Sequence, residues 1–274
     1  MTRTALVPTS LAREAGDKRE ATRKLGYVAR AAAVFRLDRL QVFPDSAGEE
    51  RWGGEFVATV LAYAATPPYL RTEVWDRRDE LEYAGVLPPV RLSPRTGSGS
   101  DGSGSLRQGL VTEVGSDGRV RVNCGLQHPI SLRVPDGMSV SAGERVTVSV
   151  SSRRPVRARL AAEPLPGFAV DRVDLATALG REDAGLRIAA SRHGTPLTAT
   201  GLRGLVRRVR DDGLTVAFGS PGRGLPTILG VDPEDAPDAT GFDRWLNTVP
   251  DQGSETVRTE EAMFASLASL TLRE

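Results

Sequence analysis

Cysteine and histidine are almost absent from the 274 residues of this sequence, which holds one cysteine, Cys124, and two histidines, His128 and His193. A single thiol cannot form a disulfide within the chain, and so few ligands cannot build the usual cysteine and histidine zinc sites. We therefore expect no metal site. The reducing cytoplasm is the natural compartment for such a composition.

Long apolar runs are missing as well. No window approaches the roughly 18 consecutive apolar residues that a membrane helix needs. The amino-terminal segment, MTRTALVPTSLAREAGDKRE, lacks the apolar core of a signal peptide. We expect no association with a membrane.

Neither sign of charge dominates, since 36 Lys and Arg residues stand against 35 Asp and Glu residues. The formal net charge of +1 excludes nucleic-acid binding through bulk positive charge, although a local basic patch stays possible. Lysine occurs only at Lys18 and Lys24. The basic side chains are therefore almost all arginines, whose planar forks suit phosphates and base edges.

Strand and helix patterns alternate at both ends of the chain. The apolar runs 4–7 and 40–43 predict buried strands, and apolar residues at helical spacing predict helices over 13–35 and 55–64. A similar alternation returns after residue 164, with predicted strands over 186–190 and 214–218, and ends in an amphipathic helix over 260–272. This order predicts an α/β fold with a parallel sheet flanked by helices.

The middle of the chain differs in composition and in the spacing of its apolar residues. The Gly/Ser-rich stretch 96–105 predicts a linker. Five short strands with intervening turns follow, over 107–114, 119–123, 130–134, 145–150 and 156–161. A small all-β barrel of the OB type is the natural candidate for five such strands. We expect a discontinuous α/β domain over 1–95 and 164–274, with an OB-like barrel domain inserted at 96–163.

Three segments could carry chemistry. The glycine-rich stretch 218–225 follows a predicted strand, where glycines let the backbone approach a ligand, although a simple tight turn explains them too. It has the spacing of neither a P-loop nor a dinucleotide fingerprint. The stretch 247–258 is dense in hydrogen-bonding groups and precedes a helix with N-capping signals at Thr259. Arg30 lies in the apolar run 26–33, either ion-paired or functional.

Together these segments resemble the SPOUT, or α/β-knot, class of S-adenosylmethionine-dependent RNA methyltransferases. The stretch 24–35, KLGYVARAAAVF, resembles the first motif of that class, Asn-x-Gly-x-x-x-Arg. Gly26 and Arg30 match this motif, whereas Lys24 stands in the place of its asparagine. The stretches 216–225 and 245–262 resemble the second and third motifs.

A narrower resemblance is to the RNA N3-methyluridine methyltransferases of archaea and eukaryotes. It rests on TPPYLR at 66–71, on GVLPP at 85–89 and on the inserted barrel, and it covers nearly the whole chain. It implies a trefoil-knotted parallel sheet, a homodimer, S-adenosyl-L-methionine as cofactor and a uridine N3 of ribosomal RNA as acceptor. Two alternatives stay open, namely a non-catalytic RNA-binding or assembly factor, and methylation of the ribose 2′-oxygen.

The resemblance also implies site residues. Arg30 is the first catalytic candidate, to hold a phosphate or to stabilise the uridine anion, and Arg258 is a secondary candidate for the same role. Glu255 and His193 are the two candidates for a general base. Arg71, Arg153, Arg154 and Arg157 are the expected RNA-binding residues. The expected cofactor-binding residues are Ser191, His193, Gly194, Thr195, Gly219, Ser220, Gly222, Gly224, Leu225, Asn247, Thr248, Val249, Pro250, Gly253, Glu255 and Thr256.

Overall fold

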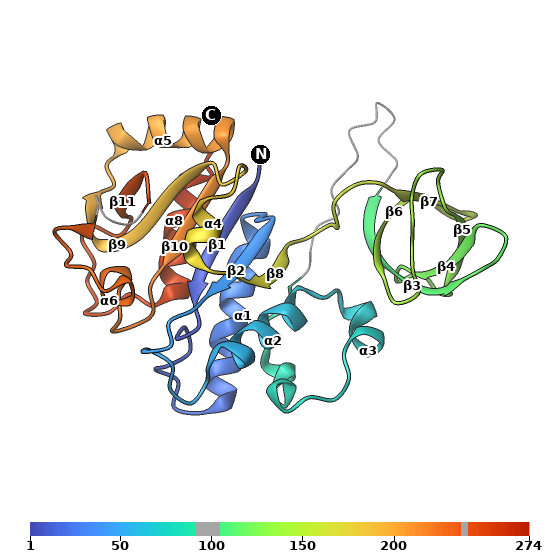
Figure 1. The fold of residues 1–274 in the computed structure, drawn as a ribbon, viewed down its shortest axis with the longest axis horizontal. Helices are drawn as coiled ribbons and strands as arrows, with labels where there is room; N and C mark the ends of the chain where they lie inside the picture. The colour runs from blue at the N-terminus through green and yellow to red at the C-terminus, as the bar shows by residue number, and fades with distance from the viewer. Residues whose placement is uncertain (91–104, 237–240, 274) are drawn as a thin grey trace. The chain divides into compact units, whose positions relative to one another are not determined.

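The computed structural model describes residues 1–90, 105–236 and 241–273 (Figure 1). Most of the predicted linker over 96–105 therefore lies outside the described residues. The chain divides into two compact units. Unit 1 consists of Met1–Ala65, Asp79–Val90 and Phe168–Glu274, and unit 2 consists of Thr66–Arg78 and Arg91–Gly167.

Unit 1 is built on a six-stranded sheet in the order β11-β9-β10-β1-β2-β8, in which every neighbouring pair is parallel. The central strands are apolar along nearly their whole length, as is usual for strands covered on both faces. The strands are β1 (Arg3–Pro8), β2 (Arg39–Phe43), β8 (Ala169–Arg172), β9 (Leu186–Pro196), β10 (Leu214–Phe218) and β11 (Arg244–Asn247).

Helices flank this sheet, as the sequence predicts. α1 begins after Asp17, whose carboxylate accepts a hydrogen bond from the backbone N–H of Glu20, and it packs against α2 and α8. Residues of α4 and α6 share one buried cluster with Leu6, Phe43 and Ala217 of the strands. The main helices of unit 1 are α1 (Lys18–Val34), α2 (Gly54–Ala65), α4 (Leu175–Leu179), α5 (Ala199–Asp212), α6 (Leu225–Leu229) and α8 (Thr259–Leu270).

Unit 2 contains an antiparallel five-stranded sheet in the order β5-β4-β3-β6-β7. Its edge strands β5 and β7 also lie against each other, so the sheet curls into a nearly closed barrel (Figure 1). The barrel interior holds valines at alternate positions together with Cys124 and Leu160. This confirms the small all-β element that the sequence predicts. Its strands are β3 (Ser105–Val114), β4 (Arg119–Asn123), β5 (Ile130–Arg133), β6 (Arg145–Arg153) and β7 (Val156–Ala161).

Residues 66–78, which the sequence prediction placed with the α/β part, pack on the barrel within unit 2. They include the helical turns η1 (Pro68–Leu70) and α3 (Arg71–Val74). The Tyr69 hydroxyl donates to the carbonyl oxygen of Gln108 at 2.9 Å, and the Arg107 guanidinium lies 5.1 Å from the Tyr69 ring centroid. A Cβ at Gly125 would come within 2.6 Å of that ring. The absence of a side chain at Gly125 therefore lets the aromatic ring pack on the barrel.

Two strands of unit 1 differ from the sequence prediction. β8 was not predicted, because an edge strand with mostly exposed residues shows no apolar run. β9 was expected to end at residue 190 in a loop, but it continues through Ser191, Arg192 and His193 to Pro196. These residues are polar and lack a strand pattern because they face a cavity rather than the core.

Among the described residues, no helix combines the length and the apolar character that crossing a membrane requires.

We expect Cys124 to report the unfolding of unit 2. Its side chain is fully buried, and this burial raises the pKa of the thiol, so that the native state offers reagents little thiolate. Dithiobis(nitrobenzoate) should label the native chain at least about 100-fold more slowly than the chain in concentrated urea, because labelling must await opening of the barrel. Because the sequence has a single cysteine, the signal has one source. Rapid labelling without urea would contradict the buried position.

Candidate functional site

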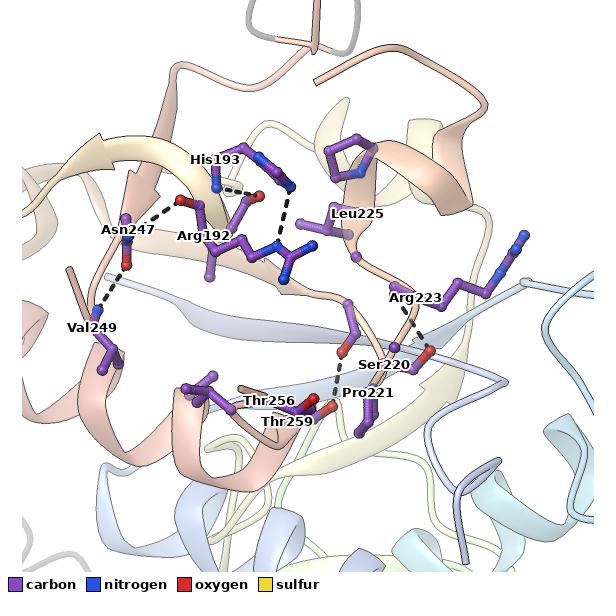
Figure 2. Close-up of a pocket in the computed structure, with 18 of the residues that line it drawn as sticks. Arg192, His193, Ser220, Pro221, Arg223, Leu225, Asn247, Val249, Thr256 and Thr259 are labelled. Atoms are coloured by element: carbon purple, nitrogen blue, oxygen red, sulfur yellow. Dashed lines mark hydrogen bonds between the residues drawn. The ribbon is translucent and has the colours of Figure 1, made fainter. Parts of the chain in front are cut away.

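A cavity of about 230 Å³ lies in unit 1 where the parallel strands β9, β10 and β11 reach their carboxyl ends (Figure 2). Its lining comes from three chain segments, 190–193, 219–227 and 247–262, with Pro233 added. The carboxyl ends of parallel strands are where open α/β sheets bind ligands. The cavity is therefore the candidate functional site.

The β9 wall of the cavity is produced by a break in strand pairing. Trp245 of β11 pairs with Ala189, whereas the next residue, Leu246, pairs with Thr195. Residues 190–194 of β9 therefore bulge between the two pairs. Asn247 stabilises the bulge, because its Nδ2 donates to the Arg192 carbonyl oxygen at 3.2 Å.

Gly194 allows this bulge to close against β11. A Cβ at Gly194 would lie 2.5 Å from the Leu246 nitrogen and 2.6 Å from the Trp245 carbonyl carbon. Contacts this short with backbone atoms cannot be relieved by side-chain motion. The structure thus gives Gly194 a packing role beside the cavity, whereas the sequence analysis expected it to contact the cofactor.

An ion pair fixes the other end of the β9–β11 pair. The backbone N–H of Arg187 donates to Oδ2 of Asp243, and its Nη2 lies 2.8 Å from Oδ1 of the same carboxylate. Hydrogen bonding to the Arg187 guanidinium is the main cause that lowers the pKa of the Asp243 carboxyl. The carboxylate therefore stays charged at neutral pH and holds β11 in register with β9.

The glycine-rich segment folds into a tight turn after β10. The backbone groups of Ser220 and Arg223 exchange two hydrogen bonds of 3.0 Å, and Gly222 between them has a φ of +68°. Pro221 followed by a residue with positive φ is the pattern of a type II turn, which favours glycine at the second central position. The turn presents backbone to the cavity without a covering side chain, since nothing lies within 4 Å of the place where a Gly222 Cβ would be.

A buried carboxylate anchors this turn. Asp45, whose side chain is 2% exposed, accepts from Nε of Arg223 at 3.0 and 3.1 Å. Ser10 Oγ lies 2.6 Å from Asp45 Oδ2 and 3.0 Å from Ser220 Oγ. The loops that follow β1, β2 and β10 are thereby joined by one polar network. Sequence analysis missed Asp45 and Ser10, because no local pattern relates residues so far apart in the chain.

The third wall comes from the segment after β11 and from the start of α8. The side-chain oxygen of Asn247 accepts from the backbone N–H of Val249 at 3.0 Å, and Gln252 Nε2 donates to the Ser254 carbonyl oxygen at 2.8 Å. Thr259 Oγ1 donates to the Gly219 carbonyl oxygen at 2.8 Å (Figure 2). Thr259 therefore joins α8 to the glycine-rich turn. The capping role considered for it falls instead to the stretch Arg258–Glu261, in which Glu261 accepts from the Arg258 backbone N–H.

The structure brings most of the expected cofactor residues onto this one cavity. The expected residues that line it are Ser191, His193, Gly219, Ser220, Gly222, Gly224, Leu225, Asn247, Thr248, Val249, Glu255 and Thr256. The expected residues outside the lining are Gly194, Thr195, Pro250 and Gly253. The lining residues that were not among the expected cofactor-binding residues are Ala190, Arg192, Pro221, Arg223, Pro226, Thr227, Pro233, Gln252, Val257, Thr259 and Ala262.

Arg30 and Arg258, two of the catalytic candidates, lie outside this lining. Arg30 Nη1 donates to the Pro89 carbonyl oxygen at 2.8 Å. A Cβ at Gly26 would meet Pro88 Cδ at 2.4 Å. Both matching residues of the first motif thus hold the segment 87–89 against α1.

The expected RNA-binding residues all belong to unit 2. Arg153, Arg154 and Arg157 are exposed where β6 turns into β7. Arg71 opens α3, and its Nε donates to the Thr66 carbonyl oxygen at 3.1 Å.

The lining combines polar and apolar groups. Arg192, His193, Arg223 and Glu255 supply charged or titratable side chains, and Arg192 Nε donates to Nε2 of His193 at 3.2 Å. Leu225, Pro226, Val249 and Val257 are among the apolar lining residues. Within the described ranges, no group of three or more His, Cys, Asp or Glu residues is arranged to hold a metal ion. A ligand with an apolar ring system and polar ends would suit this lining.

Comparison with known proteins assigns the chain to a family. Residues 2–270 match the model of the family described as "Putative RNA methyltransferase", so the chain belongs to that family and is an RNA methyltransferase. It is 67% identical over its full length to an uncharacterised protein of Halobacterium salinarum, whose full length is also covered. It is 29% identical to the 28S rRNA (uridine-N(3))-methyltransferase of Homo sapiens, with 96% of this chain and 76% of the human protein covered.

We expect Asp45→Asn to loosen the glycine-rich turn. The change removes the negative charge that pairs with Arg223 and should lower the free energy of unfolding by about 1–3 kcal/mol. Backbone amides of 219–224 should exchange with deuterium faster, as measured by mass spectrometry of peptic peptides. Asp183→Asn is the matched control, because Asp183 pairs with Arg39 and Arg181 outside the lining of the cavity. Equal acceleration at 219–224 in both variants would contradict the anchoring role of Asp45.

Proposed function

We propose that this enzyme transfers a methyl group from S-adenosyl-L-methionine to N3 of a uridine in ribosomal RNA. The observation that carries the proposal is that three distant segments line one cavity. Two of them resemble the second and third SPOUT motifs, and the third is the carboxyl-terminal half of β9. The acceptor is taken from the printed names of the human, mouse and fly relatives, each a 28S rRNA (uridine-N(3))-methyltransferase.

The lining fits a nucleoside-containing sulfonium donor. The apolar side chains Leu225, Val249 and Val257 would cover the adenine ring, and exposed backbone of 219–224 would approach the cofactor closely. Ser191, His193, Asn247, Glu255 and Thr256 offer the polar groups that its ribose and amino-acid ends require. When bound, the donor supplies an electrophilic methyl group, and the protein has to place the acceptor and manage its charge.

N3 of uridine carries a proton and lies on the Watson–Crick edge. A paired uridine would therefore have to leave its stack before it could react. We propose that Arg30 and Arg258 hold a phosphate or the developing uridine anion. Arg30 shares one face of α1 with Arg23 and Tyr27, because the three residues are spaced at helical intervals of four and three.

We further propose that unit 1 has the trefoil knot of the SPOUT class, that the barrel is an OB-like RNA-binding module and that two chains form a homodimer. Exposed arginines at the β6–β7 turn support RNA contact, since arginine positions phosphates. Tyr27 and Val34 of α1 are 47% and 48% exposed, which supports burial of this helix face by a second copy. Light scattering coupled to gel filtration gives the mass in solution.

We expect saturable binding of S-adenosylmethionine by calorimetry, and its loss in Gly222→Arg. Gly222 and Gly230 make a matched pair, because both have φ close to +68° and neither would place a Cβ within 4 Å of another atom. Only Gly222 lines the cavity. Gly222→Arg should weaken binding at least about tenfold, or about 1.4 kcal/mol, while Gly230→Arg should bind like the unchanged chain. Equal affinities in the two variants would place the donor elsewhere.

The position of the methyl group distinguishes the chemical alternatives. Ribosomal RNA incubated with the enzyme and the donor should yield N3-methyluridine on digestion to nucleosides. A 2′-O-methylated nucleoside would replace the proposed acceptor. Donor binding without transfer to any RNA would favour the non-catalytic alternative.

A further inference from the structure

The two arginines that line the cavity differ in their partners. Arg223 is neutralised, because its guanidinium pairs with the buried carboxylate of Asp45. Arg192 is exposed, and no carboxylate of the residues that the structure describes forms an ion pair with its guanidinium. Arg192 therefore brings an uncompensated positive charge to the cavity.

The backbone of Arg192 is fixed within the bulge of β9. Its carbonyl oxygen accepts from Nδ2 of Asn247 at 3.2 Å, and the bulge itself is held by the pairs that β9 forms with β11 on either side of it. From this position the side chain extends toward the other walls of the cavity (Figure 2). The sheet, rather than a free loop, thus places the guanidinium.

His193 orients the guanidinium of Arg192. Nε of Arg192 donates to Nε2 of His193 at 3.2 Å, and the backbone N–H of His193 donates to Oγ of Ser191 at 3.2 Å (Figure 2). A ring nitrogen that accepts a hydrogen bond carries no proton, so the proton of the neutral imidazole lies on Nδ1. With Nε occupied, the terminal nitrogens Nη1 and Nη2 of Arg192 form a fork that has no hydrogen-bond partner among the described residues.

Many other polar side chains of the lining are engaged within the protein. Those that form hydrogen bonds to protein atoms include Ser220, Asn247, Thr248, Gln252 and Thr259. Glu255, which also lines the cavity, forms no ion pair with Arg192 within the described ranges. The fork of Arg192 is therefore the charged hydrogen-bond donor that the cavity leaves for a ligand.

We propose that Arg192 binds the α-carboxylate of S-adenosyl-L-methionine. The proposal rests on the proposed function. Two parallel N–H groups at the end of a guanidinium match the two oxygens of a carboxylate, and such bidentate pairs are stronger than hydrogen bonds between neutral groups. The sequence analysis expected Ser191 and His193 at the cofactor but not Arg192 between them, because one arginine in a polar run has no pattern of its own.

The charges of the donor determine which of its ends meets β9. Its carboxylate is negative, whereas its α-ammonium and its sulfonium are both positive. A guanidinium attracts the first group and repels the other two. The amino-acid end therefore meets the bulge of β9 with its carboxylate toward Arg192, which leaves the apolar side chains Leu225, Val249 and Val257 for the adenine ring.

Removal of the carboxylate from the ligand tests this contact. Calorimetry compares S-adenosylhomocysteine with its decarboxylated analogue, S-adenosyl-3-thiopropylamine, which keeps the adenosine, the thioether and the amine. Neither ligand has the sulfonium charge. The unchanged chain should bind S-adenosylhomocysteine at least about tenfold more tightly than the analogue, and in Arg192→Gln this preference should fall below about twofold, because only the contact to the carboxylate is lost.

Arg208→Gln is the matched control. Arg208 is an exposed arginine of α5 that pairs with Asp212 and lies outside the lining of the cavity. This variant should keep the full preference for S-adenosylhomocysteine. Arg192→Lys should keep only part of the preference, because an ammonium retains the charge but not the planar fork.

His193→Leu tests the positioning role of His193. Leucine cannot accept a hydrogen bond from Nε of Arg192, so the guanidinium loses its fixed orientation. The preference for S-adenosylhomocysteine over the decarboxylated analogue should shrink at least about threefold. A merely structural role would weaken the binding of both ligands alike and leave the preference unchanged, which would contradict the orientation of Arg192 by His193.

The role of Arg192 can fail while the proposed function stands. Equal binding of the two ligands by the unchanged chain would overturn it, as would an equal loss of both ligands, or a loss of neither, in Arg192→Gln. If Arg192→Gln bound S-adenosylhomocysteine normally but bound a transcript of large-subunit ribosomal RNA more weakly on filters, the guanidinium would contact an RNA phosphate instead. Absence of binding of both S-adenosylmethionine and S-adenosylhomocysteine would overturn the proposed function itself.

Discussion

The shifted pairing between β9 and β11 is the constraint on which the candidate site depends. Trp245 and Leu246 are neighbours in β11, yet their partners on β9 are Ala189 and Thr195. The intervening residues of β9 bulge between these two pairs with β11, and residues 190–193 become one wall of the cavity. The arrangement needs Gly194, because any Cβ there would overlap the backbone of β11. The β9 wall of the cavity is therefore a consequence of strand register, while the other two walls come from the segments that follow β10 and β11.

The other walls are tied to this one by a few buried polar contacts. Asp45 and Ser10 join the ends of β1 and β2 to the glycine-rich turn after β10, and Thr259 joins α8 to the same turn. Such contacts are strong in a buried setting because neither partner has water as an alternative. The turn is thus held from two sides, which leaves its backbone open toward the cavity. Rigid support behind an open backbone is what close approach to a ligand requires.

The sequence predicted best what local pattern determines. The strands over 119–123, 156–161 and 214–218 agree with β4, β7 and β10, because alternation or a short apolar run marks each one. β8 and the far half of β9 were missed, since exposed edge residues and polar cavity residues carry no such pattern. The motifs indicated which loops meet, whereas the close packing of Gly194 against the backbone of β11 lies outside all three motifs and could not be predicted. The contacts of Asp45 and Tyr69 could not be predicted, because their partners are distant in the chain.

Lys24, which stands where the motif has asparagine, is a buried charge held by ion pairs. An asparagine at this position would be neutral, whereas a buried lysine demands carboxylates nearby. The structure supplies Glu14 from the segment before α1 and Glu260 from the first turn of α8. Arg258 Nε lies 3.9 Å from the Glu14 oxygen that pairs with Lys24, so segments from three parts of the chain meet around the ammonium of Lys24. Arg258 and Glu260 alternate along the chain with Val257 and Thr259, which line the cavity of the candidate site. The ion pairs around Lys24 therefore hold the same stretch of backbone that forms one wall of the proposed donor site.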